Sequence, residues 1–489
     1  MRRVFSFHTT VSFFAVFVWL YLSPVQADQL PDMGSSDSRL MTLEQERQMG
    51  REFMRSVRMQ LPLVSDPIAT RYVSALGDEL SSQLSQIDYQ FTFFIVKDNT
   101  VNAFAGPGGY IGVHTGLIMA AKNEGELASV ISHEIAHVSQ RHLLRRFEKQ
   151  SNMTLTTLAA MLAAILLGQS NSNVGSAILT SALANNTQSQ LNFSRANEKE
   201  ADYVGIDLLA KAGYDPRNMG SFFETLLAKN RVNGAEIPEF ILTHPLTTSR
   251  ISDAKNRAMQ YRRVTASNKD PDRFGLIQAR LAAPPLLYDD QQAISSPISN
   301  FVPKGKLAEP YWRILQLIAN NKLNQANMLL TTLINLDRPR IIYSVTRAEI
   351  ATKTKNYDAA NDILAKALSN NPGNQAITEL YAKTLLLNNN AEAAYKLLRV
   401  HIDNGYDQPA LYKMLSDSAR ETGRLGAAYE AFAEYHYRLG HIFLALEHFK
   451  TALSIEKDQP SQTLRLNTRL KQIKHEIFIM HQKQAEDTE

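Results

Sequence analysis

The second half of the chain repeats itself with a fixed period, and this period restricts the fold more than any other feature. Alanine recurs at equal intervals, at Ala326, Ala360, Ala394 and Ala428, within segments that read KLNQANMLL, NYDAANDIL, NAEAAYKLL and RLGAAYEAF. One phase kept through four copies is not expected of an ordinary helical bundle. Such a period is typical of helix pairs, in which a small residue allows two antiparallel helices to approach closely.

The interval matches the period of tetratricopeptide repeats, which stack into an α-solenoid with a concave surface suited to segments of other proteins. After Ala428 the phase breaks, because Ala445 follows after only half of the interval. The slip predicts an irregular last repeat and then a capping helix over 463–484. We therefore expect a repeat domain over 306–489 that binds protein partners.

The residues before the repeats predict a separate domain with a small β-sheet. Helical patterning over 43–84 is followed by an alternating aromatic and β-branched run over 89–97, a Gly-Pro-Gly-Gly turn and a short strand at 110–113. Proline-rich texture over 270–305 indicates a connector, so the first domain is expected over 28–269. Two domains also agree with 489 residues, because a single core stops growing at roughly 250–300 residues.

The N-terminus matches the pattern of a secretory leader. Two arginines precede an apolar run over 13–22, and Val25 and Ala27 supply small residues at positions −3 and −1 of a cleavage site. The run is short for a membrane span of about 20 residues, which favours cleavage over an uncleaved anchor. We expect a periplasmic protein that loses a signal peptide over 1–27.

Composition excludes two kinds of site. The formal charge of +4 falls to +2 (50 basic against 48 acidic residues) if Arg2 and Arg3 leave with the leader. Nucleic-acid binding demands a concentrated basic surface, so no nucleic-acid partner is expected. The chain has no cysteine, so disulfides and thiolate metal sites are excluded and any metal must be held by His, Asp and Glu.

The sequence His133-Glu134-Ile135-Ala136-His137 places two imidazoles at positions i and i+4. On a helix this spacing puts both on one face, close enough to share a metal ion, and Glu134 becomes the candidate general base. The preceding GELASVIS supplies an apolar helical stripe. Because the motif also occurs by chance in long chains, a metal site requires a third ligand.

Glu198 is the best candidate for that third ligand. The metzincin alternative fails because Leu143 stands where a histidine would be needed, and His142 has the wrong angular position on a continuing helix. Glu198 and Asp202 are also at positions i and i+4, so one helix face offers a metal carboxylate and a second carboxylate for the outer N–H of a ligand imidazole. Glu200 points roughly 200° away from Glu198 and is expected to be solvated.

These motifs resemble the zinc-peptidase family that contains the HtpX membrane protease and the CAAX-prenyl protease. That family combines H-E-x-x-H with E-x-x-x-D further along the chain, and Glu198 follows His137 with the separation typical of the family. The resemblance extends to Asn102-Ala103-Phe104-Ala105 and to His244-Pro-Leu-Thr-Thr-Ser-Arg250, within residues 43–262. Unlike the membrane relatives, this chain has no transmembrane helix near the motifs.

The resemblance implies a mainly α protein, with a gluzincin-type α+β metallopeptidase domain that binds one zinc ion ahead of the repeats. The residues that it carries over are the three zinc ligands and the base: His133, His137, Glu198 and Glu134. His244 and Arg250 are candidates to stabilise the oxyanion. His244 could instead occupy the fourth zinc position and keep the enzyme inactive, or merely cap a helix that starts near Thr247.

Two further segments have open interpretations. Residues 102–110 form either an edge strand, to which an extended substrate adds by main-chain hydrogen bonds, or a plain hairpin turn. The edge-strand interpretation makes Asn102, Ala103, Phe104 and Ala105 candidate substrate contacts. The apolar stretch over 155–184 is either a buried hairpin or an element that touches a membrane or a client chain.

With a leader in front and repeats behind, the family resemblance implies a periplasmic zinc endopeptidase with chaperone-like activity. Its clients would be unfolded or misassembled outer-membrane β-barrel proteins, and its partner would be the machinery that assembles them. The alternative is a chaperone or adaptor for the same assembly, whose proteolysis is normally gated off. The intact Glu134 with all three ligands speaks against an inactive enzyme.

Overall fold

The computed structural model describes residues 42–86, 89–148, 187–232, 239–261, 269–284 and 301–486. The predicted leader and the apolar segment 155–184 lie outside these residues. Among the helices within them, none has the length and apolar character needed to cross a membrane.

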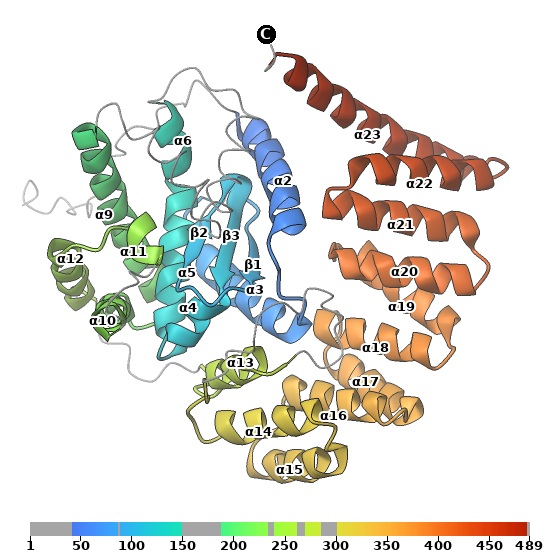
Figure 1. The fold of residues 1–489 in the computed structure, drawn as a ribbon, viewed down its shortest axis with the longest axis horizontal. Helices are drawn as coiled ribbons and strands as arrows, with labels where there is room; N and C mark the ends of the chain where they lie inside the picture. The colour runs from blue at the N-terminus through green and yellow to red at the C-terminus, as the bar shows by residue number, and fades with distance from the viewer. Residues whose placement is uncertain are drawn as a thin grey trace, which may run out of the picture. The chain divides into compact units, whose positions relative to one another are not determined.

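A three-stranded sheet forms the β part of the N-terminal region (Figure 1). It consists of β1 (Thr92–Val96), β2 (Ala103–Ala105) and β3 (Tyr110–His114), in the order β1-β3-β2. β1 runs parallel to β3, and β2 runs antiparallel to it. The short 3-10 helix η1 (Pro107–Gly109) makes the turn between β2 and β3. The strands predicted over 89–97 and 110–113 are therefore present, and β2 is an edge strand of the described sheet.

Two helices form within the stretch of helical pattern predicted over 43–84. They are α2 (Leu43–Gln60) and α3 (Pro67–Ser81). Proline disfavours a helical conformation in the residue before it, so the chain is extended at Asp66. The Asp66 carboxylate caps α3, accepting hydrogen bonds from the main-chain N–H groups of Ile68 and Ala69 at 3.0 Å each. α3 then packs against β1.

The central helix of this region is α5 (Glu124–Ser139), which follows the short α4 (Thr115–Ala120). The side chain of Asn123 caps α5 by accepting from the Glu126 N–H at 2.9 Å. Nearly every residue of α5 is buried, because it packs on the sheet, on α3 and on the helices that follow (Figure 1). Those helices are α6 (His142–Glu148), α9 (Thr187–Lys211), α10 (Arg217–Val232), α11 (Glu239–Thr243) and α12 (Thr248–Met259).

The predicted connector over 270–305 contains a helix, α13 (Arg273–Ala282), whose apolar face is buried. A continuous apolar core runs from α3 through α5 and α13 into the first repeats, and includes Val73, Leu127, Ile277 and Ile377. Only the proline-rich texture of this segment was visible in the sequence. The helix that forms within it joins the peptidase part and the repeats into one packed structure.

The C-terminal region is a stack of helices that follow one another in chain order (Figure 1). They are α14 (Ala308–Ala319), α15 (Leu323–Leu336), α16 (Ile341–Lys353), α17 (Tyr357–Asn370), α18 (Gln375–Leu387), α19 (Ala391–Asp403), α20 (Pro409–Glu421), α21 (Leu425–Leu439), α22 (Ile442–Ile455) and α23 (Pro460–Glu486).

The alanine period matches this stack. Ala326, Ala360, Ala394 and Ala428 lie in the second helix of successive pairs, and none is more than 4% exposed. Ala445, which breaks the phase, is buried in α22. The long α23 follows where the capping helix was predicted.

Candidate metal centre

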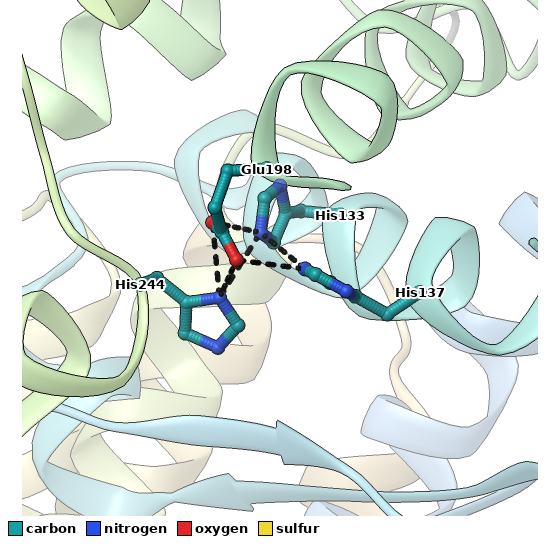
Figure 2. A group of neighbouring side chains, drawn as sticks. All are labelled: His133, His137, Glu198 and His244. Atoms are coloured by element: carbon teal, nitrogen blue, oxygen red, sulfur yellow. Dashed lines mark hydrogen bonds and ion pairs between the residues drawn. The ribbon is translucent and has the colours of Figure 1, made fainter. Parts of the chain in front are cut away.

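Four side chains from three segments converge beside the sheet (Figure 2). The spacing on α5 brings His133 and His137 to one face, and α9 packs along that face and contributes Glu198. His244 follows directly after α11. His133, Glu198 and His244 are buried, and the side chain of His137 is 13% exposed.

The ligand atoms of the four side chains lie close together. His133 Nε2 is 3.0 Å from His137 Nε2, 3.3 Å from His244 Nδ1 and 3.4 Å from Glu198 Oε2. Glu198 Oε1 is 3.1 Å from His244 Nδ1 and 3.5 Å from His137 Nε2. All four ligand atoms lie within 4.8 Å of one another.

The separations given for these atoms are close to those around a tetrahedral metal ion. Metal–nitrogen and metal–oxygen bonds of about 2.0–2.2 Å at tetrahedral angles place ligand atoms about 3.3 Å apart. The separations of 3.0 Å and 3.5 Å given above lie on either side of this value. One imidazole N–H cannot serve three acceptors at once, so hydrogen bonding alone does not account for the convergence on His133 Nε2. Three imidazoles and a carboxylate are also a donor set suited to zinc.

The outer nitrogen of His133 faces the Asp202 carboxylate. His133 Nδ1 lies 3.0 Å from Asp202 Oδ1. Arg250 donates to both oxygens of Asp202, from Nε and Nη2, at 2.8 Å each. Its Nη1 lies 2.8 Å from Glu198 Oε2 and donates to the Pro245 carbonyl at 2.9 Å. Arg250 thus holds both carboxylates and has its donor groups engaged.

The charges in this cluster balance one another. Burial alone would raise the pKa of Glu198, but the charge of His244 and hydrogen bonds from His133 and His244 hold it well below its usual range. Burial lowers the pKa of Arg250, but the hydrogen bonds and charge of Asp202 outweigh burial and raise it. The carboxylate that faces the metal position is therefore ionised and ready to bind a cation.

Glu134 is the exception in this network. It is 1% exposed, and no side chain among the described residues donates a hydrogen bond to its carboxylate, which interacts with the main chain at Ala105. Burial raises its pKa. The His244 ring is a close neighbour, because its Nε2 lies 3.5 Å from Glu134 Oε1. A buried carboxylate with so few partners is costly, and its presence calls for a chemical explanation.

The loop after α11 delivers His244 to the cluster. The His244 ring stacks on Phe240, with centroids 4.6 Å apart, and its main-chain N–H donates to the Phe240 carbonyl at 2.8 Å. The cap of α12 is Thr247, whose side chain accepts from the Arg250 N–H at 3.2 Å. His244 therefore does not cap this helix and instead lies at the fourth corner of the ligand group (Figure 2).

The predicted substrate contacts lie on or beside β2, which packs against α5. Asn102, Ala103 and Phe104 have buried side chains, and Phe104 packs edge-on against Phe53, Phe94 and His114. A substrate would therefore meet the main chain of this strand rather than its side chains. His114, which lies in β3, is buried as well.

Two residues near the centre were not predicted to contact it. His142 Nδ1 lies 2.9 Å from His137 Nδ1, and His142 Nε2 lies 3.2 Å from Glu200 Oε2. Glu200 was expected to be solvated, but its side chain is only 35% exposed and also contacts Arg145. The angular argument assumed that α5 continues as a helix, whereas α5 ends at Ser139 and the chain turns back.

Comparison with known proteins agrees with these observations. The sequence model of peptidase family M48 matches residues 67–258, and a tetratricopeptide-repeat model matches residues 351–417. The chain is 32% identical over 455 residues to the β-barrel assembly-enhancing protease of Escherichia coli (strain K12), covering 92% of each chain. It is 32% identical to the protein of that name in Yersinia pestis, covering 85% of this chain and 78% of the relative.

A further relative matches a shorter part of the chain. The mitochondrial metalloendopeptidase OMA1 of Arabidopsis thaliana is 33% identical over 165 residues, which cover 34% of this chain and 30% of the relative. The resemblance drawn from the motifs is thereby confirmed. The chain belongs to peptidase family M48, as a metallopeptidase that carries tetratricopeptide repeats and is related to the β-barrel assembly-enhancing proteases.

Proposed function

We propose that the chain is a periplasmic zinc endopeptidase that acts on outer-membrane β-barrel proteins during their assembly. The observation that carries this proposal is the convergence of three imidazoles and one carboxylate beside the buried Glu134, to which no side chain among the described residues donates a hydrogen bond. The periplasmic location rests on the predicted leader over 1–27.

His133, His137 and Glu198 would hold the zinc ion, and Asp202 would fix the ring of His133. When bound, zinc polarises the scissile carbonyl and lowers the pKa of water to about 7. Arg250 holds Asp202 and Glu198 in position through the contacts described above. These contacts favour a positioning role for Arg250, while its assignment to the oxyanion stays a prediction.

Glu134 would act as the general base. Its raised pKa and the lack of a side-chain hydrogen-bond donor to it among the described residues suit a group that accepts a proton from the attacking water and then passes it to the leaving amine. Because α5 is buried along most of its length, the carboxylate has little freedom to move away from the cluster.

His244 would keep the enzyme inactive in the conformation described here. Its Nδ1 occupies the fourth corner of the ligand group, where a water or a substrate carbonyl would otherwise lie. His244 follows the five-residue helix α11, a short element joined to α12 by a few residues, so a displacement of this loop would free the corner. The alternative, in which His244 stabilises the oxyanion, predicts the opposite effect of its removal.

The free edge of β2 would bind substrate in an extended conformation. Main-chain hydrogen bonds accept many sequences, which suits an enzyme that acts on unfolded chains. In the described sheet, β2 pairs only with β3, so no described strand occupies its other edge. β2 packs against α5, the helix that carries Glu134.

The names of the related proteases suggest the client class. They enhance β-barrel assembly according to their names, and they match this chain over most of its length. Unfolded or misassembled outer-membrane proteins are therefore the proposed substrates, and the repeats would bind these clients or the assembly machinery. Peripheral membrane contact through 155–184 stays a prediction.

A chaperone or adaptor function is the second candidate, and the position of His244 favours it. If the fourth corner is closed most of the time, the protein would hold clients more often than it cuts them. A Glu134→Gln chain that still supports β-barrel assembly would favour this function. A complete loss of support would make proteolysis the main activity.

The direct test is cleavage of a urea-unfolded outer-membrane protein by the mature chain, with and without zinc. We expect cleavage that is lost on chelation, restored by zinc and absent from Glu134→Gln. Glu134→Gln should retain one zinc per chain, which separates loss of the base from loss of the metal. Cleavage by metal-free protein or by Glu134→Gln would refute the proposal.

A further inference from the structure

A histidine and a carboxylate lie behind His137, on the side away from the other three ligands. Figure 2 shows that the outer ring nitrogen of His137 is directed away from the cluster. That atom, Nδ1, lies 2.9 Å from His142 Nδ1, and His142 Nε2 lies 3.2 Å from Glu200 Oε2. His142 is 4% exposed, so its ring has few alternative partners.

The role proposed for His137 determines which ring nitrogens of His137 and His142 carry a proton, and this inference rests on that proposed function. A neutral imidazole that offers Nε2 to a metal carries its proton on Nδ1, so His137 must donate from Nδ1. His142 Nδ1 is then the acceptor, and its own proton lies on Nε2, where it is donated to Glu200. Each of the two hydrogen bonds therefore has one donor and one acceptor.

We propose that His142 and Glu200 form a positioning relay, which fixes the tautomer and the ring orientation of His137 for zinc binding. Arg145 holds the outer end of the relay, because its Nη2 donates to Glu200 Oε2 at 3.2 Å. Glu200 lies on α9 close after Glu198, so the same helix provides a proposed ligand and the end of the relay.

The turn after α5 reverses the chain, as the relay requires, and so brings His142 back to His137. Arg141 has a φ of 52°, a left-handed conformation that residues other than glycine adopt uncommonly. This residue reverses the chain, so that α6 begins at His142 and the ring returns toward His137. The Arg141 side chain is anchored, because its Nη2 donates to Glu46 Oε2 at 3.2 Å, and the Tyr89 hydroxyl donates to the same atom at 3.0 Å.

The relay gives His137 the support that Asp202 gives His133. The two supports differ in exposure, because the Asp202 side chain is 6% exposed and that of Glu200 is 35% exposed. Solvent can partly replace Glu200 but has little access to His142. Loss of His142 should therefore weaken zinc binding more than loss of Glu200.

The test measures zinc affinity by competition with a chromophoric chelator, together with the melting temperature of the metal-free protein. His142→Phe keeps a ring but removes the acceptor, and should raise the zinc dissociation constant by about 10–100-fold. Glu200→Ala should raise it by less, and Glu200→Gln, whose amide oxygen still accepts, should remain close to wild type. Lys199→Ala is the matched control, because Lys199 is an exposed neighbour on α9 whose ion pair is with Asp253, outside the relay.

The metal-free melting temperature distinguishes positioning from packing. We expect it to stay unchanged in Glu200→Ala, whose side chain lies near the surface. Wild-type zinc affinity in both His142→Phe and Glu200→Ala would overturn the relay. An affinity loss matched by an equal fall in metal-free stability, in both variants, would also overturn it. A wild-type chain that binds no zinc would refute the proposed function itself.

Discussion

Arg280 connects the peptidase part to the first repeats, and its replacement tests how much this connection stabilises the fold. From α13, its Nε donates to Asp66 Oδ2 at 2.6 Å and its Nη1 donates to Glu349 Oε2 at 3.1 Å. Glu349, on α16, is 0% exposed. Arg280→Met therefore leaves a buried carboxylate without its counter-charge. Breaking a buried pair from one side costs about 3–5 kcal/mol, so the free energy of unfolding should fall by that amount at pH 7.

The double variant Arg280→Met/Glu349→Leu separates the cost of an unpaired buried charge from the contribution of the pair itself. It removes both charges, while the Tyr311 and Thr346 hydroxyls remain hydrogen-bonded to each other at 2.8 Å. Replacing a buried pair by apolar residues is often neutral, so most of the lost stability should return. Asp66 remains as the cap of α3 and is partly exposed, which limits its own penalty.

The pH dependence of the single variant follows from Glu349. Burial already raises the pKa of this carboxyl, and the loss of Arg280 raises it further. A carboxyl whose folded pKa is raised destabilises the fold at high pH and ceases to do so as it takes up a proton. The difference in the free energy of unfolding between Arg280→Met and the wild type should therefore decrease as the pH falls from neutral toward the acidic range.

Urea unfolding followed by circular dichroism measures these differences. If the free energy of unfolding of Arg280→Met lies within about 1 kcal/mol of the wild-type value, the stabilising role of the Arg280–Glu349 pair is refuted, since the expected cost is several times larger. A double variant as unstable as the single one would show that packing, rather than the unpaired charge, carries the effect.

Three further changes test other parts of the structure. His244→Ala should raise the rate of client cleavage by zinc-loaded protein, because it opens the fourth corner; a lower rate would assign His244 to the oxyanion instead. Burial raises the pKa of Glu379 to about 7 from 4.5, so wild-type stability should decline as the pH rises through this range. Glu379→Gln should remove that decline and stabilise the chain by up to about 3 kcal/mol at pH 8 in urea unfolding, whereas an equal decline in both proteins would contradict the argument. Gly50→Ala should destabilise the fold by about 1–3 kcal/mol, because a Cβ at Gly50 would lie 2.6 Å from the Pro107 carbonyl oxygen; an unchanged melting temperature would show that α2 can move away.

The repeats and the ligand cluster could be predicted because their signals are periodic. Ala326 and its equivalents mark the close approach of two helices, a local requirement that recurs once in every repeat. The spacing of His133 and His137 specifies one face of one helix, and that of Glu198 and Asp202 specifies a face of another. Such patterns depend on helix geometry alone, so they survive without knowledge of the tertiary structure.

The remaining features depend on contacts between distant segments. The helical pattern over 43–84 does not show the break before Asp66, whose carboxylate also binds Arg280 from a distant part of the chain. α13 forms within a proline-rich segment because its apolar face packs into the shared core. His142 returns to His137 only through the left-handed Arg141, a conformation that the helical angle of His142 could not predict.

The most direct test of the central claim is the zinc content of the purified chain, compared with that of Glu198→Ala. We predict one zinc per wild-type chain and a dissociation constant at least about tenfold weaker in Glu198→Ala, because the site loses its only carboxylate. The metal-free melting temperatures of the two proteins should be compared to exclude misfolding. A wild-type chain without zinc, or a Glu198→Ala chain that binds it as tightly, would contradict the account.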